Sequence, residues 1–188
     1  MKRVGILGGT FDPPHNGHLL AAEQVRSALS LDEIWFLPAG VPPHKKTTIT
    51  SAKQRLEMTE LAIETNCHFK VNDIELGRSG PSYTIDTMKE LKKIHPASQF
   101  YFIIGADMIA YLPKWHKIDE LSRLIEFAGV NRSGYSAETV YPVHLIDIPA
   151  FDISSSLIRE RVKNDLSVKY MVSDQVIRFI KENRLYEN

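Results

Sequence analysis

The feature that most restricts the fold of this sequence is the alternation of short apolar runs with longer stretches of helical spacing. The apolar runs cover residues 4–7, 34–37, 100–104, 127–130 and 143–146, with a weaker run at 68–71. Such runs are typical of strands that are buried on both faces of a parallel sheet. The stretches of helical spacing cover residues 18–29, 51–65, 84–94, 119–125, 155–164 and 173–182. This order predicts right-handed crossovers and an α/β fold with a doubly wound parallel sheet.

The length and composition predict one domain over residues 1–188. Hydrophobic residues make up 43% of the chain, so a single core can form without disulfides. Lysine plus arginine equal aspartate plus glutamate at 23 each, which gives a formal net charge of zero. A neutral chain has no bulk field that attracts polyanions, so we expect neither nucleic acid nor a membrane as a partner. Any phosphate recognition has to come from local groups.

Two features predict a cytoplasmic location. Cys67 is the only cysteine, so no intramolecular disulfide can form, which suits a reducing compartment. The apolar run near the N-terminus ends at Gly8 and Gly9, too early for a signal peptide, and no other run approaches the length of a membrane span.

The most informative segment is GGTFDPPHNGH at residues 8–18, between the first predicted strand and the first predicted helix. Ligands of open α/β sheets bind at the carboxyl ends of strands. The adjacent Gly8 and Gly9 allow a ligand to approach the backbone closely, and the helix N-terminus that follows favours an anion. The position and composition of this segment predict a phosphate site.

Two common phosphate loops do not match this segment. A Walker loop needs Gly-Lys-Ser/Thr, and the segment has no lysine, whereas the Rossmann fingerprint needs a spacing that Gly5, Gly8 and Gly9 do not have. What remains is the pair His15 and His18, whose imidazoles lie near one helix end and can donate hydrogen bonds to phosphate oxygens in a transition state. Helix capping and metal ligation are the alternatives, although zinc would require a third protein ligand.

A second segment, ISSSLIR at residues 153–159, opens the penultimate predicted helix. Its serines can cap the helix, and the hydroxyls and amides of Ser155 and Ser156 can also bind phosphate. Arg159 lies about one turn into the helix, where its planar guanidinium can bind a polyphosphate bidentately. The alternative is an ordinary serine cap with a solvated arginine.

Together the two segments resemble the signatures of the nucleotidyltransferase superfamily. The first is similar to Gly-x-Phe-Asp followed by His/Thr-x-Gly-His, and its Pro-Pro-His-Asn resembles bacterial nicotinate-mononucleotide adenylyltransferases in particular. The second is similar to Ile-Ser-Ser-Thr-x-Ile-Arg, with Ser156 in place of the threonine. The resemblance implies a Rossmann-like fold and transfer of the adenylyl group of ATP to nicotinate mononucleotide, which yields deamido-NAD and pyrophosphate. The alternatives are cytidylyl transfer and another acceptor, such as phosphopantetheine or nicotinamide mononucleotide.

The resemblance also implies roles for individual residues. It places the catalytic groups at His15, His18 and Arg159. It places ATP at Gly8, Gly9, Thr10, Phe11, Gly105, Asp107, Ser155 and Ser156, and the acceptor at Tyr83, Thr84, Trp115, Lys45 and Arg132. Mg²⁺ is expected to enter with ATP as substrate, with no metal site built by the protein itself. A homodimer is compatible with the resemblance.

Asp107 and Lys45 each have an ordinary structural alternative. Asp107 follows an apolar run at its carboxyl end and borders the nucleotide in the family, but an aspartate there can also cap the next helix. Lys45 belongs to the Pro-Pro-His-Lys sequence within residues 41–50, which we expect to form a mobile loop. A loop lysine is usually solvated.

The acceptor positions distinguish one branch of the superfamily from another. Trp115 matches a tryptophan that stacks on the pyridine ring in family members. Tyr83 and Thr84 precede a helix whose free amides can hold the nicotinate carboxylate, and Thr84 can also be a simple cap. Arg132 matches a family arginine, but Ser133 stands where the family more often has proline, so the role of Arg132 is open.

Overall fold

The computed structural model of the chain describes residues 1–40, 48–78, 80, 82–132, 139–149 and 152–187. Within these residues, six parallel strands form one sheet in the order β3-β2-β1-β4-β5-β6. The strands are β1 (Lys2–Gly9), β2 (Glu33–Pro38), β3 (Phe69–Val71), β4 (Ser98–Gly105), β5 (Glu126–Arg132) and β6 (Val143–Ile148). Each predicted apolar run therefore forms a strand, and the strand order confirms the doubly wound parallel sheet.

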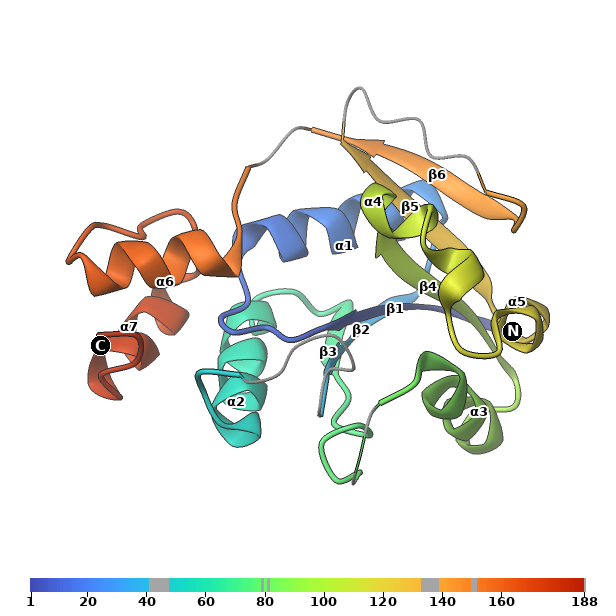
Figure 1. Cartoon of the computed structure of the whole chain (residues 1–188), viewed down its shortest axis with the longest axis horizontal. Coiled ribbons are helices and arrows are strands. Elements are labelled where there is room, and N and C mark those ends of the chain that lie inside the picture. Colours follow the sequence, from blue (N-terminus) through green and yellow to red (C-terminus); the bar gives the residue numbers. More distant parts are fainter. Residues whose placement is uncertain (41–47, 79, 81, 133–138, 150–151, 188) are drawn as a thin grey trace.

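Helices cover both faces of the sheet (Figure 1). They are α1 (Asn16–Ala28), α2 (Ala52–Ile63), α3 (Thr84–Ile94), α4 (Ala106–Ile109), α5 (Ile118–Leu124), α6 (Ser155–Lys163) and α7 (Asp174–Glu182), with a 3₁₀ helix, η1 (Leu112–Lys114). Each predicted helix is confirmed to within one turn. The sequence pattern does not predict α4 and η1, because a single turn leaves no periodicity to detect.

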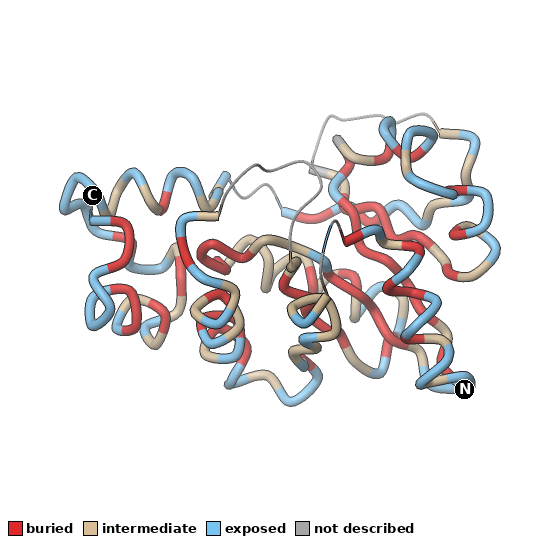
Figure 2. The backbone as a smooth tube through the Cα atoms, turned by 60° about the horizontal axis from the view of Figure 1, so that its bottom comes forward, coloured by how far each residue is buried: buried red, intermediate tan, exposed pale blue. Residues whose placement is uncertain are grey.

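Side chains that alternate along the strands fill two apolar cores, one on each face of the sheet. In β1, Val4 and Ile6 belong to one core and Leu7 to the other. The Val4 core lies beneath α3, α4 and α5, and the Leu7 core lies beneath α1, α2, α6 and α7. The buried backbone follows the strands through the centre of the molecule (Figure 2). Burial on both faces explains why the strands read as nearly continuous apolar runs.

The sheet topology determines where a ligand can bind. β1 lies between β2 and β4, and the strand order reverses at this point. In such sheets the connections that leave the two central strands diverge to opposite faces, so a crevice forms at the carboxyl ends of the strands. α6 and α7 lie beyond the N-terminal end of α1, at the same edge (Figure 1). None of the described helices is long and apolar enough to cross a membrane.

Candidate active site

The junction between β1 and α1 is built around the ring of Phe11. This residue has a left-handed backbone, with φ of 51°, and its side chain is 1% exposed. A Cβ atom on Gly9 would lie 2.8 Å from the Phe11 ring, so only glycine leaves room for that ring. Phe11 therefore belongs to the core, and a contact between Phe11 and ATP would use its backbone rather than its side chain.

The two histidines of the first segment stack on each other at the start of α1. Their ring centroids are 3.7 Å apart with an interplanar angle of 27°. His15 is the N-cap, and its amide donates to Nδ1 of His18 at 3.2 Å. Since an amide can only donate, Nδ1 of His18 accepts, and the neutral ring carries its proton on Nε2. The pair thus caps the helix and at the same time prepares His18 Nε2 as a hydrogen-bond donor.

The second segment lies directly against the first. Nη1 of Arg159 donates to the carbonyl of Asp12 at 2.6 Å, and Nη2 donates to the Ser156 hydroxyl at 3.1 Å. The Ser155 hydroxyl donates to the carbonyl of Pro13 at 2.8 Å. Partners 142 and 147 residues apart in the sequence therefore meet. The structure brings His15, His18, Ser155, Ser156 and Arg159 together at one edge of the sheet.

A serine caps α6, as expected. Ser154 is the N-cap, and its hydroxyl accepts from the Leu157 amide at 3.2 Å. The Ser155 and Ser156 hydroxyls hold Pro13 and Arg159, respectively. Their contribution to a phosphate site would come from the backbone amides of the first helical turn, which have no partner within the helix.

Three buried residues of the site are not singled out by the sequence pattern. Asp12 is 4% exposed, and its carboxylate accepts from the hydroxyls of Thr50 and Tyr186 at 2.8 Å and 2.6 Å. Arg55 is 1% exposed and Tyr186 is 6% exposed. For Asp12, the only sequence signal of a role in the site is that it lies inside the first segment. Nothing in the local sequence marks Arg55 or Tyr186.

Arg55 joins the carboxyl ends of β1 and β2. Its Nη1 donates to the carbonyls of Thr10 at 2.9 Å and Ala39 at 2.7 Å, and its Nη2 donates to the carbonyl of Gly40 at 3.3 Å. Burial lowers the pKa of the Arg55 guanidinium, while the neighbouring Asp12 opposes that shift. A buried cation with three carbonyl partners holds the floor of the site in a fixed geometry.

The predicted acceptor residues lie on the other face of β1. Trp115 packs edge-on against Phe102, with ring centroids 5.8 Å apart, and is half-buried. A Cβ atom on Gly8 would lie 3.3 Å from the same Phe102 ring, which places Gly8 on the Trp115 side of the strand. Tyr83 is the N-cap of α3, and its ring lies 4.6 Å from that of His116, next to Trp115 in the chain.

A network of side chains holds the segment that leads into α3, where Thr84 is the first helical residue. The Thr87 hydroxyl donates to Glu75 at 2.8 Å and accepts from Arg78 at 2.9 Å. Burial raises the pKa of the Glu75 carboxyl, against the opposing hydrogen bond from Thr87 and the charge of Arg78. These contacts hold the N-terminal turn of α3 against the segment that precedes it.

The remaining predicted residues lie at the carboxyl edge or outside the described part of the chain. Gly105 is the exposed last residue of β4 and the N-cap of α4, so Asp107, inside α4, is not the cap. Arg132 is the last residue of β5. The side chains of Asp107 and Arg132, and the whole of Lys45 with most of the predicted loop, lie outside the described residues.

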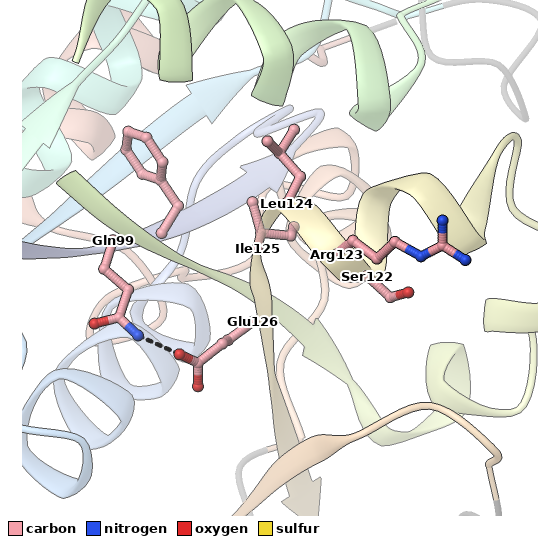
Figure 3. A pocket seen from close by; sticks show the side chains of 7 residues that line it. Gln99, Ser122, Arg123, Leu124, Ile125 and Glu126 are labelled. Carbon is pink, nitrogen blue, oxygen red and sulfur yellow. Dashed lines mark hydrogen bonds between the residues drawn. The ribbon is translucent and has the colours of Figure 1, made fainter. Parts of the chain in front are cut away.

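A shallow pocket lies at the opposite edge of the sheet, where β4 and β5 begin (Figure 3). It is lined by Gln99, Phe100 and residues 122–126, and a hydrogen bond from Gln99 to Glu126 closes one side. None of the predicted site residues lines it. Among the described residues, no three His, Cys, Asp or Glu side chains are grouped so as to hold a metal ion.

Comparison with known proteins agrees with this arrangement. The cytidylyltransferase-like family matches residues 6–161. The Bacillus subtilis protein named "Nicotinate-nucleotide adenylyltransferase" is 52% identical, with 100% of both chains covered. A protein of Oceanobacillus iheyensis named "Probable nicotinate-nucleotide adenylyltransferase" is 54% identical, over 99% of this chain and 97% of its own. The chain belongs to the nicotinate-nucleotide adenylyltransferase family. As a member of this family it is a nucleotidyltransferase, and the resemblance seen in the two segments is confirmed.

Solved structures agree on the fold of this adenylyltransferase. A Plasmodium falciparum nicotinic acid mononucleotide adenylyltransferase, in a complex with NaAD, superposes with a TM-score of 0.83. The alignment covers 100% of this chain and 98% of that one at 24% sequence identity. The Rossmann-like nucleotidyltransferase fold of the family is thus conserved at a low level of sequence identity.

Proposed function

We propose that this protein transfers the adenylyl group of ATP to the phosphate of nicotinate mononucleotide, as a step of NAD biosynthesis in the cytoplasm. The observation that carries the proposal is the direct contact of the two signature segments, in which Arg159 donates to the Asp12 carbonyl at 2.6 Å. Membership of the nicotinate-nucleotide adenylyltransferase family over the full chain supports the choice of acceptor. The free, exposed Cys67 suits a reducing compartment.

The reaction requires alignment more than acid–base chemistry. An oxygen of the acceptor phosphate, already an anion at neutral pH, attacks the α-phosphorus of ATP. A new P–O bond forms while the bond from the α-phosphorus to the α–β bridging oxygen breaks, and pyrophosphate leaves with that oxygen. Catalysis is then mainly positioning of the two substrates and stabilisation of charge on phosphate oxygens. No covalent intermediate with the enzyme is needed.

The protein supplies donors on two sides of the triphosphate. His15 and His18 donate to oxygens of the α- and β-phosphates, with Nε2 as the donor of His18. Backbone amides of residues 8–11 bind the bridging region. Arg159 and the first amides of α6 stabilise the departing pyrophosphate. Because Arg159 is held by Asp12, its guanidinium needs little reorganisation when the charge develops.

The acceptor binds on the other face of β1. Trp115 stacks on the pyridine ring, and the amides at Tyr83 and Thr84 hold the nicotinate carboxylate at the N-terminus of α3. Nicotinamide lacks this negative charge, so the helix N-terminus favours the acid over the amide. Gly105, Asp107, Lys45 and Arg132 complete the proposed ATP and acceptor contacts. Mg²⁺ enters with ATP as substrate, because Mg²⁺ keeps water and phosphate oxygens as ligands.

Parallel assays of pyrophosphate release test the proposal. The enzyme is incubated with MgATP and one of three acceptors: nicotinate mononucleotide, nicotinamide mononucleotide or phosphopantetheine. We expect the fastest release with nicotinate mononucleotide, with deamido-NAD as the second product. Faster release with either other acceptor would mean that the enzyme acts on that acceptor. Faster release with CTP in place of ATP would mean that it transfers a cytidylyl group. ATP binding without pyrophosphate release under any condition would reduce the protein to a nucleotide-binding module.

A further inference from the structure

Asp12 is bound to three segments that are distant in the sequence. Its carbonyl accepts from Arg159 of α6, and its carboxylate accepts from the Ile49 amide at 2.9 Å and from Thr50, which follow β2. The third segment is the end of the chain, through the Tyr186 hydroxyl at 2.6 Å. The bonds from Thr50 and Tyr186 to the carboxylate are buried, so they are shielded from water and fix the Asp12 side chain firmly.

Tyr186 is held in place independently of Asp12. It follows α7, whose end is closed by a bond from the Leu185 amide to the Ile180 carbonyl at 3.0 Å. Its hydroxyl lies 3.9 Å from Sδ of Met58, in the core shared by α2 and α7. Burial, reinforced by the Asp12 carboxylate, raises the pKa of Tyr186 far above its usual range, so the hydroxyl stays a neutral donor.

We propose that Tyr186 is a positioning residue for ATP: its hydroxyl fixes the Asp12 carboxylate, and Asp12 in turn fixes the guanidinium of Arg159. The inference rests on the proposed function and adds a residue near the end of the chain, 174 positions from Asp12, to the machinery that orients the triphosphate. Tyr186 acts through Asp12 and need not touch the substrate.

The hydrogen bonds predict which part of the site changes when the Tyr186 hydroxyl is removed. Without the Tyr186 hydroxyl, one oxygen of the buried Asp12 carboxylate loses one of its two side-chain donors and keeps only Thr50. A buried carboxylate with fewer donors rotates or recruits water, and either response moves the Asp12 carbonyl that Arg159 holds. Trp115 packs against the other core, and Tyr83 lies exposed against His116, so we expect this movement to leave both acceptor residues in place.

The test is Tyr186→Phe in the full chain, with Tyr101→Phe as the matched control. Tyr101 is also a buried tyrosine, 3% exposed, and its hydroxyl accepts from Arg3 at 2.9 Å, but it pairs with the first residue of β5 at the opposite edge of the sheet. We expect Tyr186→Phe to lower kcat/KM for ATP about 10- to 100-fold, as for a small misplacement of reacting groups, with KM for nicotinate mononucleotide changed less than about twofold. Tyr101→Phe leaves both constants near the wild-type values.

A double variant tests whether Tyr186 acts through Asp12. Thr50→Val removes another donor of the same carboxylate, so Tyr186→Phe and Thr50→Val should combine non-additively in kcat/KM for ATP. A folded Tyr186→Phe enzyme with unchanged ATP kinetics, or equal losses in Tyr101→Phe, would overturn the proposal and leave Tyr186 as a structural anchor. Failure of the wild-type enzyme to release pyrophosphate would instead contradict the proposed function, so the two outcomes are distinguishable.

Discussion

Nη1 of Arg159 lies 2.6 Å from the carbonyl oxygen of Asp12, although the two residues are 147 positions apart in the sequence. The bond ties α6 to the segment between β1 and α1, next to His15 and His18 at the start of α1. With Nη2 bonded to Ser156 at 3.1 Å, the guanidinium is held in one orientation before substrate arrives. This contact places the two signature segments side by side, where we propose that one triphosphate touches both.

Replacement of Arg159 tests the pyrophosphate side of the site. Arg159→Ala removes a fixed cation, so we expect kcat/KM for ATP to fall about 10²-fold, the typical loss for one transition-state donor, with little change in KM for the acceptor. Arg161→Ala is the control, because Arg161 lies on the same helix but donates to the Ser167 carbonyl at 2.8 Å, away from the other segment. Steady-state kinetics with ATP and the acceptor varied in turn would distinguish the Arg159→Ala variant from the Arg161→Ala variant. An unchanged ATP dependence in Arg159→Ala would contradict the role.

Two replacements of His18 separate its capping role from its catalytic role. A glutamine at this third helical position can still accept from the N-cap amide, as in a capping box, whereas alanine cannot. Alanine also removes the ring donor, so we expect His18→Ala to lose roughly 10²–10³ in turnover, whereas glutamine keeps an amide NH₂ donor and should lose less. His18→Ala should also lose about 1 kcal/mol of unfolding free energy, and His18→Gln much less. Near-normal turnover in folded His18→Ala would refute the assignment.

Trp115 is expected to affect only the acceptor. Trp115→Ala should raise KM for nicotinate mononucleotide about 3- to 10-fold, the range expected for loss of one aromatic contact, and leave KM for ATP unchanged. Trp115→Phe keeps a ring next to Phe102, so its KM for nicotinate mononucleotide should lie between those of the wild type and Trp115→Ala. A matched rise in both KM values would show that Trp115 supports the fold of the site rather than the pyridine ring.

A carboxylate far from the site gives the protein a predictable acid sensitivity. Burial opposes the charge of Glu33, but hydrogen bonds from Lys2, Lys70 and Trp35 outweigh it and lower the pKa to about 2. A lowered folded-state pKa gives stability that is present above the unfolded value, near 4.5, and is lost as the pH falls toward 2. Glu33→Gln should therefore cost about 1 to 2 kcal/mol at pH 7.

The stabilities of wild type and Glu33→Gln at low pH test whether the charge of Glu33 is what stabilises the protein. Urea unfolding of wild type and Glu33→Gln, measured from pH 7 to pH 2, should show the two stabilities converging below about pH 4. A difference that stays constant across this range would mean that Glu33 contributes through packing and not through its charge.

Removal of divalent metal should stop the reaction without unfolding the protein. Because we propose that Mg²⁺ enters with ATP as substrate, we expect EDTA to abolish pyrophosphate release and added Mg²⁺ to restore it, with the melting temperature unchanged in the absence of ATP. A fall in melting temperature with EDTA alone would point to a metal held by the protein itself.

The fold could be predicted because each strand and long helix leaves its own local pattern. The apolar run at residues 100–104 becomes β4, and the helical spacing at residues 84–94 becomes α3. α4 is a single turn and leaves no such pattern. Its limits are set by tertiary contacts, which local spacing does not encode.

The site could be predicted only where its residues are grouped in the sequence. His15 and His18 are three positions apart, so their shared position at one helix end follows from helix geometry. Arg55 and Tyr186 reach the site by tertiary contacts across 45 and 174 positions, and no local pattern announces such contacts. Phe11 is the opposite case: it lies inside the signature, but its side chain is buried in the core and does not line the site.

The central claim is that both signature segments bind the same triphosphate. A crystal structure of the enzyme with Mg²⁺ and a non-hydrolysable ATP analogue tests it most directly. We predict phosphate oxygens within hydrogen-bond distance of His18 Nε2 and of the Arg159 guanidinium in one molecule of the analogue. A triphosphate that contacts only one of these residues, or that lies away from the carboxyl ends of β1 and β4, would contradict the account.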